Sequence, residues 1–308
     1  MIDERSQSPW GTKVALYMFF EGAGAAAWLL VFFLSLLSRL PSLFILTSLL
    51  TAVALVLVGV LCLWLDLGRK DRFYWAMSSL NRSWISRGTF MVTLFLILSV
   101  AYILVLVWPS PWLREAYMVK WVLGGMSVLT AAAITVYPGL LLKSCKPFKL
   151  WDSPLIIVLS VMLSLLSGVA VTLLVVSSVA LGSDTAARSM ALLQMGLGLS
   201  GGLVLGSTVT FVIHLAINYG MGGLARISVL RLFQGNLSSQ FIFATVSGWI
   251  LPLVLIFPAF SADGSGRILL SAISGISLLV GSFLLRHLLL VAPLRDTVPV
   301  IPFISAPT

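Results

Sequence analysis

The chain has 308 residues, of which 59% are hydrophobic and only 9% are charged. Soluble domains carry about 25% charged residues, so this composition excludes both a soluble globular domain and a disordered chain. The 19 Lys and Arg residues against 10 Asp and Glu give a formal net charge of +9. Nucleic-acid binding would require a soluble basic domain, and no segment between the apolar stretches is long enough to form one.

Long apolar stretches recur along the chain at lengths that fit transmembrane helices. A bilayer core about 30 Å thick takes about 20 apolar residues per helix, whereas a transmembrane β-barrel shows alternating segments of about 10 residues. The sequence therefore predicts an all-α integral membrane protein in which residues 1–308 form a single polytopic domain. We expect eight helices in two four-helix bundles, with both termini on the same side. The predicted spans lie near residues 13–37, 42–65, 88–108, 117–142, 154–180, 190–216, 240–260 and 267–291.

The first span contains Glu21, the one acidic residue inside any predicted span. An ionisable side chain at the centre of a bilayer costs about 2.5–3.5 kcal/mol on insertion scales, so it usually faces a partner, a cavity or a ligand. Glu21 is therefore the first candidate for a functional residue, with a structural hydrogen bond as the alternative. We do not expect the span to be a cleaved signal peptide, because its apolar run exceeds the 7–15 residues of a signal sequence.

Small residues predict where helices pack closely. Gly198, Gly202 and Gly206 recur every four residues in the sixth span, and small residues at this spacing allow helix backbones to approach. The Gly and Ala residues at 22–27 and the pair Gly124 and Gly125 have the same interpretation. These rows indicate packing and not chemistry.

The distribution of Lys and Arg predicts the orientation. With eight spans, 14 of the 19 basic residues fall on the side of the termini and 5 on the other side. We expect the protein to lie in the cell (inner) membrane. The positive-inside rule then predicts that both termini are in the cytoplasm. Basic loops that dock an acidic partner subunit would give the same bias.

The loop after the second span has a high density of basic residues. Arg69, Arg72, Arg82 and Arg87 offer planar bidentate donors that suit carboxylates on another subunit, and Asp66 can pair with one of them. Ser83 or Ser86 is expected to cap the third helix. A solvated basic loop that only obeys the positive-inside rule is the alternative.

Motifs in five ranges occur in an order that resembles one family. They are Asp-x-Gly-Arg and Arg-Phe at 66–73, Ser-Trp-x-Ser-x-Gly at 83–88, a Tyr-x-Phe-x-x-Gly start at 17–25, Tyr-Pro-Gly-Leu-Leu at 137–141, and Lys-Pro-Phe to Trp-Asp-Ser-Pro at 146–154. Together they resemble the NrfD-like family, the membrane subunits of polysulfide, dimethyl sulfoxide and related reductases. The resemblance covers roughly the first 170 residues, and the second half is similar in span number and hydropathy.

This resemblance implies a pocket for menaquinone or ubiquinone between the first and fourth helices. Tyr17 and Tyr137 would donate hydrogen bonds to the quinone oxygens, as amphipathic phenols can. Glu21 lies about 6 Å deeper than Tyr17 on the same helix face, and it would exchange a proton with the quinone. Pro138 stands where the family usually has a small hydroxyl residue.

The resemblance also implies partners, since family members carry no haem or iron–sulfur cluster of their own. The chain would exchange electrons with a ferredoxin-like iron–sulfur subunit, which serves a catalytic subunit that is often a molybdopterin enzyme. Several members dock this partner outside the cytoplasm on the side of the termini, whereas the charge count here places that side inside. The residues expected to dock the partner are Asp66, Arg69, Arg72, Arg82, Arg87, Lys146, Trp151 and Asp152.

Two other functions stay open from the sequence. His214 and His287 lie near helix ends on the same side, and two neutral imidazoles on neighbouring helices can hold a haem. A proton-coupled transporter of small molecules is the second alternative, for which broken helices around a midplane site are typical. Cys62 and Cys145 form no recognisable metal or disulfide pattern.

Overall fold

The computed structural model describes residues 10–37, 40–67, 80–108, 117–182 and 186–295. These ranges form helices without a β-strand, and eight spans among them are long and apolar enough to cross a membrane. The prediction of an all-α protein with eight spans is therefore confirmed. The elements are α1 (Thr12–Leu37), α2 (Ser42–Asp66), α3 (Trp84–Val107), α5 (Tyr117–Ser144), η2 (Lys149–Trp151), α6 (Leu155–Gly182), α7 (Ala186–Gly220), α8 (Gly223–Gln234), α9 (Ser238–Thr245), the π turn η3 (Val246–Ile250), α10 (Leu251–Ser261) and α11 (Gly264–Val291).

The predicted ends of the spans are close to the observed ones, and α3 shows what moves them. The prediction begins this span at residue 88, but the helix begins at Trp84. Ser83 is its N-cap, and its hydroxyl accepts a hydrogen bond from the backbone N–H of Ser86 (3.4 Å). The cap satisfies a backbone donor that a helix start leaves without a partner, so polar residues extend the helix beyond its apolar run.

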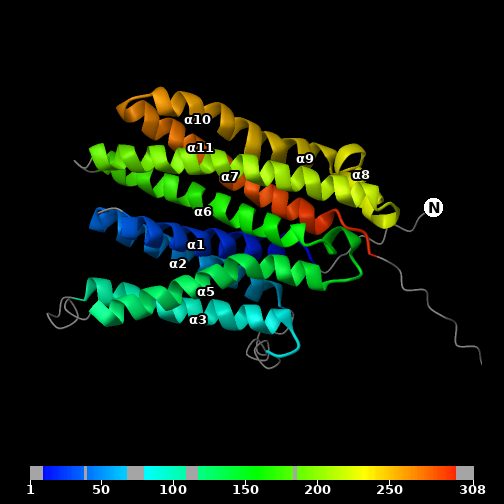
Figure 1. Cartoon of the computed structure of the whole chain (residues 1–308), viewed down its shortest axis with the longest axis horizontal. Coiled ribbons are helices and arrows are strands. Elements are labelled where there is room, and N and C mark those ends of the chain that lie inside the picture. Colours follow the sequence, from blue (N-terminus) through cyan, green and yellow to red (C-terminus); the bar gives the residue numbers. More distant parts are fainter. Residues whose placement is uncertain (1–9, 38–39, 68–79, 109–116, 183–185, 296–308) are drawn as a thin grey trace, which may run out of the picture.

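The helices lie side by side along the long axis of the molecule (Figure 1). α1 and α6 occupy the middle, where α1 contacts α2, α5, α6 and α11, and α6 also contacts α7. α3 and α5 lie at one edge in Figure 1, and α10 lies at the other. The grouping into two four-helix bundles stays a prediction.

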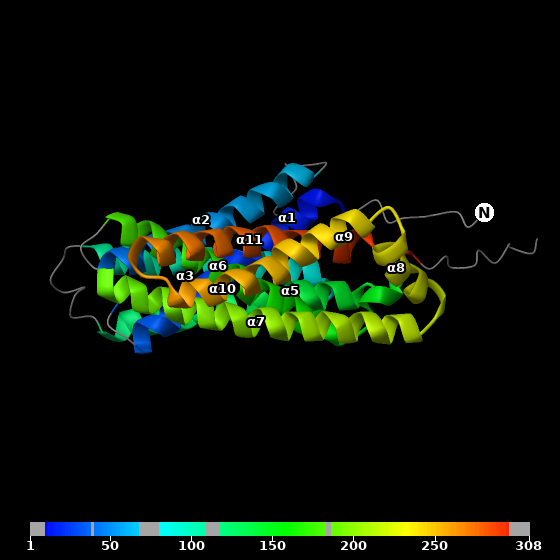
Figure 2. The same ribbon diagram turned by 90° about the horizontal axis from the view of Figure 1, so that it is seen from above.

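The start of α1 and the end of α11 lie at one end of the bundle, which we call the terminal end. Thr12 Oγ1 is 3.5 Å from His287 Nε2, and the centroids of the Phe19 and Phe283 rings are 5.7 Å apart. α8 lies at the same end (Figure 2). The side of the membrane that this end faces stays a prediction.

The loop between α5 and α6 lies at the terminal end. Trp151 of η2 is fully buried, and its indole N–H donates to the carbonyl of Leu289 (2.8 Å). The Trp10 and Phe148 rings pack on it, with centroids 5.6 and 4.5 Å away. These contacts fix the segment between α5 and α6 to the last turn of α11.

Close helix packing occurs in the predicted stretch at 22–27, and also at a glycine outside the predicted rows. A Cβ at Gly24 would lie 2.5 Å from the carbonyl oxygen of Ala52 in α2, and Gly281 lies against Gly248 of η3. The prediction for the row at 198, 202 and 206 is wrong, because a Cβ added at Gly202 would meet no atom within 4 Å and one at either of the other two would make only an ordinary contact. Spacing shows that a helix face is small, but it does not show what lies opposite that face.

Candidate functional site

Glu21 and Arg286 are the charged side chains that are buried in the described part of the chain. Glu21 is 0% exposed and Arg286 is 5% exposed. They come from helices at opposite ends of the sequence, α1 and α11, which contact each other. Buried charges are normally paired or placed for function, because their desolvation is costly.

Tyr17, Glu21 and Tyr137 form one cluster between α1 and α5. The Tyr17 phenol lies beside both the Glu21 carboxyl and the Tyr137 phenol, and all three side chains are buried. The structure thus brings together the three residues that the family resemblance selects. Their role in binding a quinone stays a prediction.

Glycines on neighbouring helices make room for this cluster. A Cβ at Gly59 of α2 would lie 3.1 Å from the backbone nitrogen of Glu21 and 3.1 Å from the carbonyl oxygen of Tyr17. At Gly88 of α3, a Cβ would overlap the ring of Tyr137. Gly88 ends the motif at 83–88, so the motif has a physical explanation: the Tyr137 ring occupies the space of the missing side chain.

The Glu21 carboxyl has charge nearby but no full hydrogen bond. Arg286 and Tyr17 are close enough to act on it electrostatically. No hydrogen bond of acceptable distance and angle reaches either carboxyl oxygen in the described structure. Buried polar atoms are satisfied in most proteins, and exceptions point to a catalytic role or to a ligand or water.

Arg286 is held on the other side by α6. Its Nη2 donates to the Ser164 hydroxyl (2.7 Å) and to the carbonyl of Ser160 (3.3 Å). A Cβ at Gly22 would lie 2.9 Å from that nitrogen, so the guanidinium passes directly over the backbone next to Glu21. The sequence does not single out Arg286, because the predicted span at 267–291 contains it close to the helix end, where a cation is common. The apolar residues Leu288–Val291, which follow it within that span, are the sequence signal that Arg286 does not lie at the very end of the helix.

A small cavity lies beside the guanidinium. It is lined by Met18, Pro138, Ser160 and Arg286, among others, and measures about 20 Å³. A cavity needs roughly 10–15 Å³ to hold a water molecule, and a water needs polar partners. The Nε of Arg286 and the hydroxyl of Ser160 both lack a hydrogen-bond partner, so this cavity offers a place for one water.

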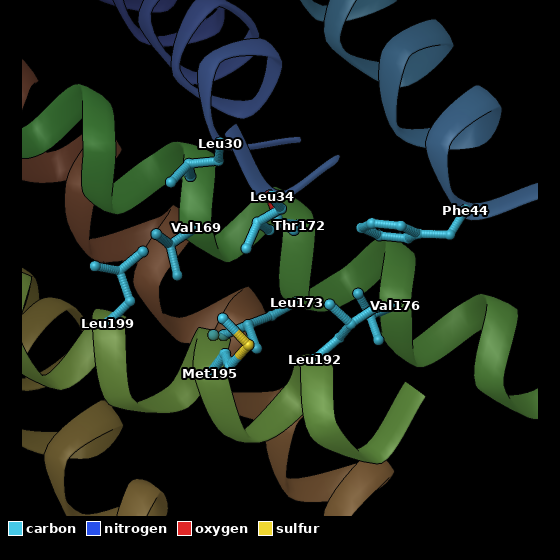
Figure 3. Close-up of a pocket in the computed structure, with 11 residues that line it drawn as sticks. Leu30, Leu34, Phe44, Val169, Thr172, Leu173, Val176, Leu192, Met195 and Leu199 are labelled. Atoms are coloured by element: carbon cyan, nitrogen blue, oxygen red, sulfur yellow. The ribbon is translucent and has the colours of Figure 1, made fainter. Parts of the chain in front are cut away.

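Figure 3 shows a larger and almost wholly apolar cavity, which borders the half of α1 farther from the terminal end. It measures about 190 Å³ and is bounded by α1, α2, α6 and α7. Leu30, Leu34 and Phe44 form part of its wall, and its one hydroxyl residue, Thr172, donates to its own helix at Gly168 (2.8 Å). No wall atom is placed to recognise a polar group, so the cavity suits hydrocarbon.

Some of the predicted docking residues bind one another or their own loops. Lys146 and Asp152 form an ion pair (2.7 Å), and the hydrogen bond from Lys146 lowers the pKa of the Asp152 carboxyl. Asp66 pairs with Lys13 of α1 (3.5 Å). These charges therefore stabilise the terminal end within this chain, and their part in docking stays a prediction.

The remaining residues predicted to dock the partner differ in how exposed they are and in what they contact. Arg87 donates to the carbonyls of Leu80 (2.8 Å) and Asn81 (2.9 Å) and stacks over the Trp84 ring. Arg82 is exposed, whereas Trp151 is buried and anchors its loop. Arg69 and Arg72 lie outside the described residues.

The two histidines have separate neighbours. His214 is buried on α7, where the Asn218 amide donates to its backbone carbonyl (2.8 Å). His287 lies near Thr12 and the Phe283 ring. The described residues contain no group of three or more His, Cys, Asp or Glu side chains that could hold a metal ion.

Comparison with known proteins gives the family. A search of curated proteins finds no match. A family model described as polysulphide reductase, NrfD, matches residues 1–295. The match extends well beyond the first 170 residues that carry the sequence motifs. The chain therefore belongs to the NrfD family, the membrane subunits of polysulfide reductase and related reductase complexes.

Proposed function

We propose that this chain is the quinone-binding subunit of an oxidoreductase complex and exchanges electrons between the membrane quinone pool and an iron–sulfur partner. One observation carries the proposal: two phenols and an acid without a full hydrogen bond are gathered inside the bundle between α1 and α5. NrfD-family members are quinone-interacting membrane subunits, and these residues suit that ligand.

The donor set fits a quinone head group. Reduction of a quinone to a quinol takes up two electrons and two protons at its two oxygens. Tyr17 and Tyr137 offer O–H donors that can orient those oxygens, and Glu21 can release or accept a proton beside them. Because the three side chains are buried, a head group reaches them only by displacing neighbouring side chains. Menaquinone and ubiquinone both have the required oxygens.

The electrons need a carrier in a partner subunit. An iron–sulfur cluster is usually held by four Cys thiolates, and the whole sequence has two Cys. The terminal end offers a docking surface for a ferredoxin-like subunit, which would serve a catalytic subunit such as a molybdopterin enzyme. Its exposed cations include Arg82 and Lys146, beside the ordered loop that Trp151 anchors.

The orientation is part of the proposal. We infer that the protein lies in the cell membrane with its terminal end in the cytoplasm, as the basic residues indicate. The catalytic partner would then also be cytoplasmic. Reaction of a membrane-impermeant reagent with Cys145, which lies directly after α5 at the terminal end, reports this side in sealed vesicles.

Turnover of a quinol analogue by the purified complex tests the proposal. Glu21→Gln and the double change Tyr17→Phe with Tyr137→Phe should each slow turnover by about 100-fold, the scale of a lost proton donor or acceptor. Tyr102→Phe is the matched control, because this phenol lies on α3 against Trp28, away from Glu21. Wild-type turnover in both variants would remove the basis of the proposal.

Two further measurements separate the alternatives. A proton-coupled transporter would show substrate counterflow when the chain is purified alone and reconstituted. A haem at His214 and His287 would give a Soret band that disappears in His214→Ala. A complex that oxidises quinol without either property supports the quinone proposal.

A further inference from the structure

We infer that Arg286 is a positioning residue of this site: it is the fixed positive partner of Glu21 and holds the carboxyl in its working environment. The effect on quinone turnover rests on the function proposed above. The coupling between the two side chains does not, and it can be measured with no quinone bound.

Glu21 and Arg286 lie in the same part of the bundle. Glu21 and Arg286 have opposite charges and are buried in the same part of the bundle, on the contacting helices α1 and α11. A lone buried charge is unfavourable, and a nearby opposite charge compensates for part of that cost. The guanidinium lies over Gly22, the residue directly after Glu21.

The helices around Arg286 hold its guanidinium in one place. Ser164 and the carbonyl of Ser160 hold one end of the guanidinium from α6. Gly22 leaves open the space that this contact needs, since any Cβ there would meet both Ser164 and Arg286 at under 3 Å. Three helices are thus shaped around Arg286. A charge that only marked the membrane boundary would point to the interface and would need no such anchor.

One nitrogen of the Arg286 guanidinium group makes no hydrogen bond. Its Nε has no hydrogen-bond partner, and Arg286 lines the small cavity together with Ser160, so the hydrogen bonds to α6 do not use all the donors of the guanidinium. Arg286 can therefore stabilise negative charge nearby without moving. When the O–H bond of Glu21 breaks and its proton passes to a quinone oxygen that has received electrons from the iron–sulfur partner, the carboxylate left behind faces a cation that keeps its own protons.

Infrared difference spectroscopy on the intact complex tests the coupling directly. The carboxyl band of Glu21 is assigned by its loss in Glu21→Gln. It should move in Arg286→Lys and Arg286→Gln, and also in Ser164→Ala, which removes the anchor and keeps the charge. Arg267→Gln is the matched control, because Arg267 lies on the same helix but donates to the carbonyls of Ala259 and Phe260.

Thermal unfolding of the quinone-free complex gives a second test. Arg286→Gln should lower the midpoint more than the double variant with Glu21→Gln, because the single change leaves the acid without its cation. If Arg286→Gln does not assemble, Arg286→Lys and Ser164→Ala provide the comparison. A Glu21 band that stays in place in all three variants, or strictly additive midpoints, would overturn the inference.

Turnover then separates this inference from the proposed function. We expect Arg286→Gln to slow quinol turnover by up to about 100-fold, the scale of a misplaced reacting group, and Arg286→Lys to recover part of the loss. A shifted Glu21 band with unchanged turnover in every variant would leave the pairing intact and refute the quinone role. An unshifted band with lost turnover in Glu21→Gln would do the reverse.

Discussion

The two halves of α1 lie in opposite kinds of surroundings. The half nearer the terminal end carries Tyr17 and Glu21 among polar groups, where the adjacent cavity holds about 20 Å³. The other half, about 14 Å along the helix from Glu21 to Leu30, borders a cavity of about 190 Å³ with hydrocarbon walls. One region has recognition groups and little space, and the other has space and almost no recognition groups. We therefore expect substitutions around Tyr17 and Glu21 to have larger effects than substitutions in the wall of the apolar cavity.

A change at Gly88 should have the largest effect on the polar half. Gly88→Val places a branched side chain where the Tyr137 ring lies, and overpacking of this kind costs about 1–3 kcal/mol or more. We expect a lower melting midpoint and lost quinol turnover. Gly125→Val on α5 is the control, since a Cβ there meets no neighbour within 4 Å. Equal effects of the two changes would contradict the close fit at Tyr137.

Removing one hydroxyl from each region should have effects of intermediate size on stability, and the two losses can be compared. Ser164→Ala removes a partner of the Arg286 cation and should cost about 1–3 kcal/mol of stability. Thr172→Val, in the apolar cavity, removes a hydroxyl that bonds only its own helix, and it should cost less than about 1 kcal/mol. Melting midpoints of the two variants test this order. A larger loss for Thr172→Val would show that the apolar cavity depends on a polar contact.

The smallest effect is expected outside the membrane, at Asp152. Its pKa is lowered by the hydrogen bond from Lys146, with Lys149 and Lys143 adding positive charge. Because the folded-state pKa is depressed, this stabilisation is present above the ordinary Asp pKa of about 3.9 and is lost as the pH falls through the lowered value. Asp152→Asn should cost about 0.2–1 kcal/mol near neutral pH, since the pair is exposed.

The pH dependence of that difference is the check. The gap in melting midpoint between wild type and Asp152→Asn should shrink below about pH 4 and in high salt. Asp263→Asn is the control, an exposed carboxylate at the start of α11. A gap that stays constant across the pH range would mean that the Lys146 pair does not carry the effect.

The sequence predicts the spans well because the bilayer sets their length. It also identifies Glu21, since one acid in an apolar run has no ordinary explanation. Arg286 escapes such an interpretation, because a cation near a helix end is common and only the fold places Ser164 and Gly22 around it. The glycine row at 198–206 fails for the same reason: the partner of a small face is a property of the tertiary structure. Gly88 was noted in a motif, but its contact with Tyr137 is visible only in three dimensions.

The pairing of α1 with α11 has a consequence for how the protein is made. α1 is synthesised before α11, so Glu21 enters the bilayer long before its cation is made. Until α11 inserts, the nascent chain carries the acid in lipid without its cation. We therefore expect a chain truncated before α11 to be degraded by membrane proteases faster than the chain that contains it.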